Sequence, residues 1–250
     1  MRFDIISLFP DMLNAYFGES ILKRAQAADL INIAVHDLRP FGVGKHRITD
    51  EPPVGGGGGM VLKPEPIFAA VESIPPKPSA PIILLSPQGR PFTQRVAEEL
   101  VKHDQLVLIC GRYEGFDERV REQLVTDEIS IGDYVLTGGE LGAMVIVDAV
   151  SRLIHGVLGD EQGAASDSHA TTLLEGPHYT KPMKFRDWDV PALLRSGNGK
   201  KIAQWRREAA LRRTWERRPD MLISAELTHS DKRFLLQLAI EEAQRVKSGE

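Results

Sequence analysis

The chain of 250 residues contains one cysteine, Cys110, so no intramolecular disulfide can form. Because Cys110 ends the apolar stretch QLVLIC, we expect a buried, reduced thiol. No apolar stretch approaches the ~18 residues of a membrane helix, and no basic leader followed by an apolar segment opens the sequence. These absences predict a cytoplasmic protein with no membrane partner.

Several motifs of nucleotide, metal and nucleophile sites are also missing. No G-x-G-x-x-G follows an expected strand, and GVGKH lacks the first glycine and the final Ser or Thr of a phosphate-binding loop. The seven histidines form no i, i+4 pair and no Cys–His set. No G-x-S-x-G elbow presents a nucleophile. The sequence therefore predicts no zinc centre of a familiar kind and no serine hydrolase.

Glycine, by contrast, is concentrated in one run, Gly55 to Gly59, within EPPVGGGGGMVLKPEP. The flanking prolines forbid an immediate helix, which argues against a phosphate cradle at a helix N-terminus. Strand and helix patterns resume on both sides, which argues against an interdomain linker. We therefore expect a loop whose backbone lies close to a ligand.

Strands alternate with helices over residues 1–158. The expected strands are RFDIISLF, INIAVHDL, APIILLS, QLVLIC and DEISI, and the expected helices include TQRVAEELVKH, ERVREQLV and one from about Gly138 to Ile154. This alternation predicts an α/β domain with a mostly parallel sheet. Residues 159–172 are small and polar, which indicates a flexible linker. Residues 173–250 have only helical signals, including a possible capping box in THSD, and predict a small all-helical domain.

Three of the expected strands run into loops rich in glycine or proline: LLSPQGRP, LICGRYEG and ISIGDYVLTGGE. Ligands of parallel α/β sheets bind outside the carboxyl ends of the strands, so we expect one pocket lined largely by main chain. Thr137 and Glu140 also have the spacing of a capping box, with Thr137 as N-cap. This box either simply starts the helix or leaves the N–H groups of Gly138 and Gly139 for a ligand.

The charge is distributed unevenly along the chain. The net charge is −4, yet residues 181–220 contain 12 Lys and Arg against 5 Asp and Glu. Arg206, Arg213 and Arg217 are spaced by seven and four residues and therefore share one face of an expected helix. Such a stripe suits the phosphates of a nucleic acid, although a solvated helix with paired charges fits equally well.

Five longer motifs occur in order along the chain: GRYEGFDERV, SIGDYVLTGGELGAM, DAVSRLIHGVLG, SDSHATTLLEGPHYTKP and LLRSGNGKKIAQWR. Together they resemble the bacterial tRNA (guanine-N1)-methyltransferases of the SPOUT class. The resemblance implies a trefoil-knotted α/β fold with a helical C-terminal domain, in a homodimer with its active site at the subunit interface. It also implies methyl transfer from S-adenosyl-L-methionine to N1 of guanosine 37 of tRNA, next to the anticodon.

The resemblance further implies roles for individual residues. Asp167 would be the general base for the N1 proton, and Arg152 would stabilise charge on O6. The residues expected at the cofactor are Pro87, Gly111, Ile131, Gly132, Asp133, Tyr134, Val135, Leu136, Gly138 and Gly139. Those expected at the tRNA are Gly57, Glu114, Ser168, Arg206, Arg213 and Arg217. The resemblance also makes a magnesium ion possible, although the sequence shows no acidic cage that would hold one.

Two positions depart from the family pattern: His169 replaces a common phenylalanine, and Gly58 replaces a common proline. Two rival hypotheses remain, a tRNA-binding SPOUT protein without activity and a SPOUT methyltransferase that acts on another RNA. Asp167 and Arg152 argue against the first, and the stretch from SDSH to PHYTKP argues against the second.

Overall fold

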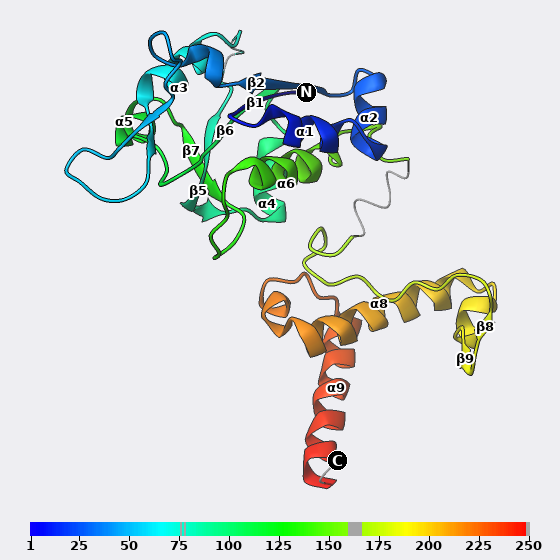
Figure 1. The fold of residues 1–250 in the computed structure, drawn as a ribbon. Coiled ribbons are helices and arrows are strands. Elements are labelled where there is room, and N and C mark those ends of the chain that lie inside the picture. Colours follow the sequence, from blue (N-terminus) through cyan, green and yellow to red (C-terminus); the bar gives the residue numbers. More distant parts are fainter. Residues whose placement is uncertain (76, 78, 160–166, 249–250) are drawn as a thin grey trace. The chain divides into compact units, whose positions relative to one another are not determined.

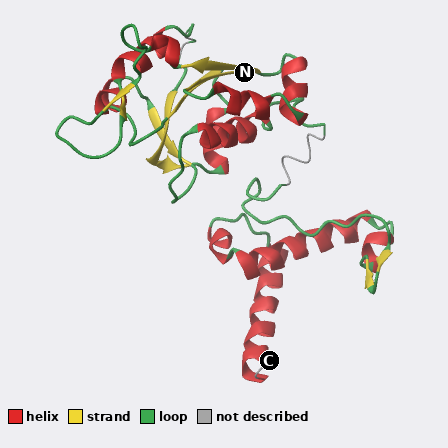
Figure 2. Cartoon of the chain, in the orientation of Figure 1, coloured by secondary structure: helices red, strands yellow, loops and turns green. Residues whose placement is uncertain are grey.

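The computed structural model describes residues 1–75, 77, 79–159 and 167–248. The chain divides into two compact units, Met1–Glu161 and Gln162–Glu250. Figure 2 shows a sheet with flanking helices in the first unit and mainly helices in the second. The expected linker, residues 159–172, falls partly outside the described residues, so its role stays a prediction.

The first unit is built on a five-stranded sheet in the order β2-β1-β6-β5-β7, and each neighbouring pair is parallel. Its strands are β1 (Arg2–Ser7), β2 (Asn32–Asp37), β5 (Ile82–Pro91), β6 (Gln105–Cys110) and β7 (Asp127–Ser130). The short strands β3 (Asp50–Glu51) and β4 (Val61–Leu62) pair antiparallel on either side of the glycine run. The predicted α/β class is confirmed.

Helices cover both faces of this sheet (Figure 1). One face packs against α1 (Pro10–Phe17), α2 (Ser20–Ala27), α4 (Gln94–Leu100) and α6 (Glu140–Ser151). The other packs against η1 (Arg39–Phe41), α3 (Pro64–Glu72) and α5 (Glu118–Gln123).

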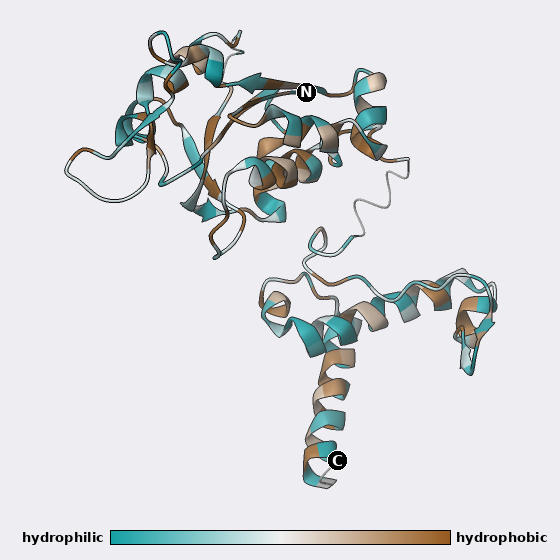
Figure 3. Cartoon of the chain, in the orientation of Figure 1, coloured by the Kyte–Doolittle hydropathy of each residue, from teal (hydrophilic) through white to brown (hydrophobic). Residues whose placement is uncertain are grey.

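The sequence of the central strand explains the two cores. Side chains alternate across a strand, so Leu106 and Leu108 of β6 enter the first core while Val107 and Ile109 enter the second. All residues of β6 are buried, as expected for a strand of a parallel sheet covered on both sides. Figure 3 shows hydrophobic colours along the central strands and α6.

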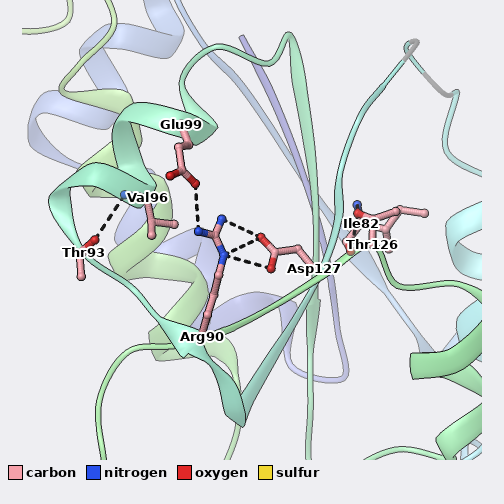
Figure 4. Close-up of polar contacts among 7 residues, drawn as sticks. All are labelled: Ile82, Arg90, Thr93, Val96, Glu99, Thr126 and Asp127. Carbon is pink, nitrogen blue, oxygen red and sulfur yellow. Dashed lines mark hydrogen bonds and ion pairs between the residues drawn. The ribbon is translucent and has the colours of Figure 1, made fainter.

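The end of β5 contains a bulge that the sequence pattern treats as a loop. Its pairing with β7 shifts register between Leu85 and Arg90, so the intervening residues leave the ladder. Arg90 then fixes the resumed strand, because its guanidinium hydrogen-bonds Asp127 of β7 at 3.0 Å and Glu99 of α4 at 2.9 Å (Figure 4). This bulge presents residues 86–89 at the carboxyl edge of the sheet.

The second unit contains η2 (Ala192–Arg195), α8 (Gly199–Arg217), η3 (Pro219–Ile223) and α9 (His229–Ser248). The predicted capping box of THSD is confirmed: Thr228 Oγ1 accepts from the Asp231 N–H at 3.2 Å, and Asp231 Oδ2 accepts from the Thr228 N–H at 2.8 Å. Among the described residues, no helix is long and apolar enough to cross a membrane.

The unit is not entirely helical, which corrects the expectation for residues 173–250. An antiparallel hairpin joins β8 (Lys184–Phe185) to β9 (Trp188–Asp189). Two-residue strands are too short to show a period of two in the sequence, so helical signals alone were visible there.

The bulge in β5 gives a first prediction. A Cβ at Gly89 would lie 2.4 Å from the backbone N of Ile129 in β7, so the Gly89→Ala variant must push two strands apart. We expect the free energy of unfolding to fall by about 2 kcal/mol, measured by urea denaturation. The matched control is Gly58→Ala, because a Cβ at Gly58 meets nothing within 4 Å. Equal stabilities of the two variants would contradict this account of the bulge.

Candidate functional site

A cavity of about 280 Å³ opens at the carboxyl edge of the sheet, where β6, β5 and β7 are neighbours. Its wall is formed mainly by residues 86–88 in the bulge of β5, residues 111–116 after β6, and residues 130–132 and 134–139 at the end of β7 and in the loop that follows. The three loops that the sequence predicts to converge therefore do so. The cavity lies wholly within the first unit.

Nine of the ten residues expected at the cofactor line this cavity, and so does Glu114, which was expected at the tRNA. The exception is Asp133, which is exposed and is not among the lining residues. The lining also includes residues that were not predicted to contact the cofactor or the tRNA: Leu85, Ser86, Gln88, Arg112, Tyr113, Gly115, Phe116, Arg121, Ile129, Ser130, Thr137 and Gly142. Most of them adjoin the predicted residues in the same three loops, and this proximity in sequence could have identified them as lining residues.

Gly139 allows the loop after β7 to return against the end of β6. Its N–H donates to the carbonyl of Gly111 at 2.9 Å. A Cβ at position 139 would lie 2.8 Å from Cys110 Cα, too close for any other residue. Two segments far apart in the sequence thereby form one wall of the cavity.

Glu140 does not take the role that the capping-box spacing predicts. The N-cap of α6 is Gly139, and no side chain caps this helix. The Glu140 carboxylate is instead only 1% exposed, accepts a 2.7 Å hydrogen bond from Ser7 Oγ and lies 2.9 Å from Arg112 Nη2. The first turn of α6 packs on the ends of β1 and β6, where a buried carboxylate requires an opposite charge. The Glu140 carboxylate therefore pairs with Arg112 and does not form the capping box with Thr137.

Arg112 extends this contact to the loop that covers the cavity. Its Nη1 donates to the carbonyl of Thr137 at 3.2 Å, and its guanidinium lies 4.5 Å from the ring centroid of Phe9. The side chain thus connects the end of β1 with the loop of residues 131–139. Arg112 lies inside the motif GRYEG, yet no spacing in the sequence reveals its partners.

Cys110 lies beneath the same wall and is a free, buried thiol, as predicted. Burial, reinforced by the negative charge of Glu140, raises the pKa of the Cys110 thiol well above its usual value. The thiol is therefore neutral at physiological pH. Cys110 acts as a packing residue, because nucleophiles and metal ligands require the thiolate.

The glycine run adopts backbone angles that favour glycine. Gly55, Gly56, Gly57 and Gly59 have φ between +80° and +126°, whereas Gly58 does not have a positive φ. A Cβ at Gly59 would meet the carboxylate of Glu114, a residue of the cavity wall, at 2.4 Å. The end of the run therefore adjoins the cavity, while Gly57 is exposed and is not among the lining residues.

The two residues expected to act on the guanine base lie in different units. Arg152 is the half-buried C-cap of α6 and is not among the lining residues of the cavity. Asp167 belongs to the second unit, where its carbonyl accepts from the Ala170 N–H at 3.1 Å. Next to it, Ser168 Oγ accepts from the Glu175 N–H at 3.0 Å, and His169 has a φ of 72°.

The predicted arginine stripe of α8 is only partly free. Arg213 donates to the carbonyl of Glu175 at 2.8 Å, whereas Arg206 and Arg217 are exposed and form no ion pair with another described residue. The paired-charge alternative holds for other arginines of the helix: Arg207 lies 3.0 Å from Asp231, and Arg212 lies 3.7 Å from Glu241.

Within the described part of the chain, no three His, Cys, Asp or Glu side chains are grouped to hold a metal ion.

Comparison with known proteins identifies the family. The family model described as tRNA (Guanine-1)-methyltransferase TrmD matches residues 1–224. Relatives named tRNA (guanine-N(1)-)-methyltransferase include one from Dehalococcoides mccartyi (strain 195), 56% identical over 97% of this chain and 98% of its own. Others come from Geobacillus kaustophilus, 56% identical over 94% and 97%, and Moorella thermoacetica, 52% identical over 98% and 99%. The chain therefore belongs to the tRNA (guanine-N1)-methyltransferases, a family of enzymes.

Proposed function

We propose that this enzyme transfers a methyl group from S-adenosyl-L-methionine to N1 of guanosine 37 in tRNA, in the cytoplasm. The observation that carries the proposal is the cavity at the carboxyl edge of the sheet, lined by the loops that bear the family motifs. The relatives' names supply the base and the atom that those proteins modify.

The cavity wall fits a donor that combines an adenosine with a charged tail. Gly111, Gly138 and Gly139 leave main-chain groups near the ligand space, while Tyr134 and Val135 add exposed apolar surface, with Val135 89% exposed. Mixed walls of this kind hold small molecules by apolar contact and a few polar groups. When bound, the donor would supply a methyl group from an activated sulfonium, whose S–C bond breaks to leave a neutral thioether as the N–C bond forms.

The remaining chemistry belongs to the chain and the RNA. Guanine N1 bears a proton at neutral pH, so its lone pair is not free to attack. In the proposed mechanism, the Asp167 carboxylate accepts that proton as the new N–C bond forms. The Arg152 guanidinium stabilises the negative charge that develops on O6. Gly57, Glu114 and Ser168 are proposed to contact the target nucleotide.

The second unit is proposed to hold the tRNA. Arg206 and Arg217 are exposed on α8, and Arg213 lies on the same face. Contacts from such a stripe to phosphates position a nucleic acid without reading its sequence. In this proposal, the second unit brings the tRNA and Asp167 to the cofactor.

We also propose that the enzyme is a homodimer with the SPOUT knot that the resemblance implies. The first unit exposes apolar side chains on the adjacent helices α1 and α6 and just before α1 (Figure 1): Phe9, Met12, Tyr16, Leu141 and Val145. Exposed apolar side chains on two helices in contact suit a second copy of the chain, which would place the proposed active site at the interface.

The function is tested by methyl transfer from labelled S-adenosylmethionine to two tRNA transcripts that differ only at position 37. We expect incorporation with guanosine and none with adenosine, because only the guanine presents the N1–H and O6 pair. Equal incorporation would refute the specificity. Tight binding of both transcripts without any transfer would support the rival hypothesis of an inactive tRNA-binding protein.

The role of Asp167 is tested by the Asp167→Ala variant. Loss of a general base should lower kcat roughly 100- to 10,000-fold while calorimetry finds unchanged binding of S-adenosylmethionine. Asp220→Ala in the same unit is the control, since it removes an exposed carboxylate whose ion pair is with Arg218. If Asp167→Ala abolishes cofactor binding, the residue has a structural role instead.

The Glu140 contact predicts a coupled loss of stability and affinity. In Glu140→Gln, the Arg112 guanidinium loses its charged partner, so we expect the free energy of unfolding to fall by about 2 kcal/mol and S-adenosylmethionine to bind more weakly. The control is Glu65→Gln, which removes an exposed carboxylate from a surface ion pair with Lys63 in the same unit. Unchanged cofactor affinity in Glu140→Gln would show that this contact supports only the fold.

A further inference from the structure

The hairpin of the second unit holds two aromatic rings at its tip. Phe185 of β8 pairs with Trp188 of β9, and their ring centroids lie 6.1 Å apart. Arg186 and Asp187 form the two-residue turn, and Arg186 has a φ of 55°. A turn with positive φ matches the twist of a tight hairpin, which keeps the two rings side by side on one face.

Both rings are largely exposed. Phe185 is 57% exposed and Trp188 is 65% exposed. The Arg186 guanidinium lies over both rings, 5.3 Å from the centroid of Phe185 and 5.8 Å from that of Trp188. The cation thus sits beside aromatic surface that no described residue covers fully.

The surroundings of the hairpin are cationic. Residues 181–201 contain six exposed basic side chains, against two acidic ones at Asp187 and Asp189. The basic residues are Lys181, Lys184, Arg186, Arg195, Lys200 and Lys201. In the described parts of the chain, none of the six forms an ion pair with a carboxylate. Unpaired cations in this number favour a polyanionic partner.

We infer that this hairpin is a stacking site for an unpaired nucleobase of the RNA substrate, with Lys184 and Arg186 contacting its phosphates. Exposed aromatic rings next to lysine and arginine match the chemistry of single-stranded RNA, whose bases stack on aromatic side chains. The base is unpaired, because bases within a duplex are stacked on each other and present only their edges. The inference rests on the proposed function only for the identity of the RNA as tRNA.

A second copy of the chain is a less suitable occupant. Two copies of this hairpin would bring like charges together, which disfavours association through this face. An RNA strand instead supplies negative charge and flat apolar surface at once. The positive charge around the hairpin therefore favours an RNA strand over a second copy of the chain.

The test compares tRNA affinity of the full chain over a range of salt concentrations, by fluorescence anisotropy with labelled tRNA. Trp188→Ala should weaken binding roughly tenfold without changing the salt dependence, and Trp188→Phe, which keeps a ring, should restore most of the affinity. Lys184→Ala should weaken binding and reduce the slope of log K against log salt by about one. Ile223→Ala removes another exposed apolar side chain, 90% exposed, from the same unit and should change nothing.

Methyl transfer at saturating tRNA separates this inference from the proposed function. Near wild-type turnover of Trp188→Ala at saturation, with weakened tRNA affinity, supports the stacking site. Unchanged affinity in Trp188→Ala overturns it. A sedimentation coefficient of Trp188→Ala that differs from the wild-type value in the absence of tRNA also overturns it, since the hairpin would then contact another copy of the chain. Wild-type protein that binds tRNA through the hairpin but transfers no methyl group would refute only the proposed function.

Discussion

The architecture of the candidate site depends on one buried contact, between Glu140 at the start of α6 and Arg112 after β6. A carboxylate that is 1% exposed is stable only with its charge matched. The Arg112 guanidinium, in the loop after β6, supplies the opposite charge, and the Ser7 hydroxyl at the end of β1 donates a hydrogen bond. The close backbone approach at Gly139 brings the helix near enough for the ion pair to form. The ion pair and the close approach at Gly139 together hold the cavity wall in place.

This contact explains how a wall with several glycines can keep one shape. A loop rich in glycine loses more conformational entropy on folding than other loops, so it needs external anchors to keep one shape. Arg112 provides one anchor at the Thr137 carbonyl, and the hydrogen bond from Gly139 to Gly111 provides another. All four residues of these two anchors line the cavity, so the wall is held by contacts among its own residues.

Local patterns predicted the elements, and long-range contacts decided the rest. Alternation of strands and helices predicted the parallel sheet, and the spacing in THSD predicted the cap of α9, because both depend on neighbouring residues. The same spacing at Thr137 and Glu140 gave a wrong prediction, since Ser7 and Arg112 compete for the carboxylate from distant positions. Nothing in the sequence near Arg90 revealed the bulge of β5, which depends on Asp127 and Glu99 in other elements. The cavity could be placed at the strand ends, but its internal anchors could not.

The second unit links the segment that carries Asp167 to the helix proposed to contact RNA. The Leu174 N–H donates to Thr214 Oγ1 at 2.9 Å, and Arg213 donates to the Glu175 carbonyl at 2.8 Å. Glu175 in turn donates its N–H to Ser168 Oγ, next to Asp167. Because these hydrogen bonds join residues 168–175 to α8, RNA held by α8 would be positioned together with the proposed base. In the proposed mechanism, proton acceptance would thereby depend on correct engagement of the RNA.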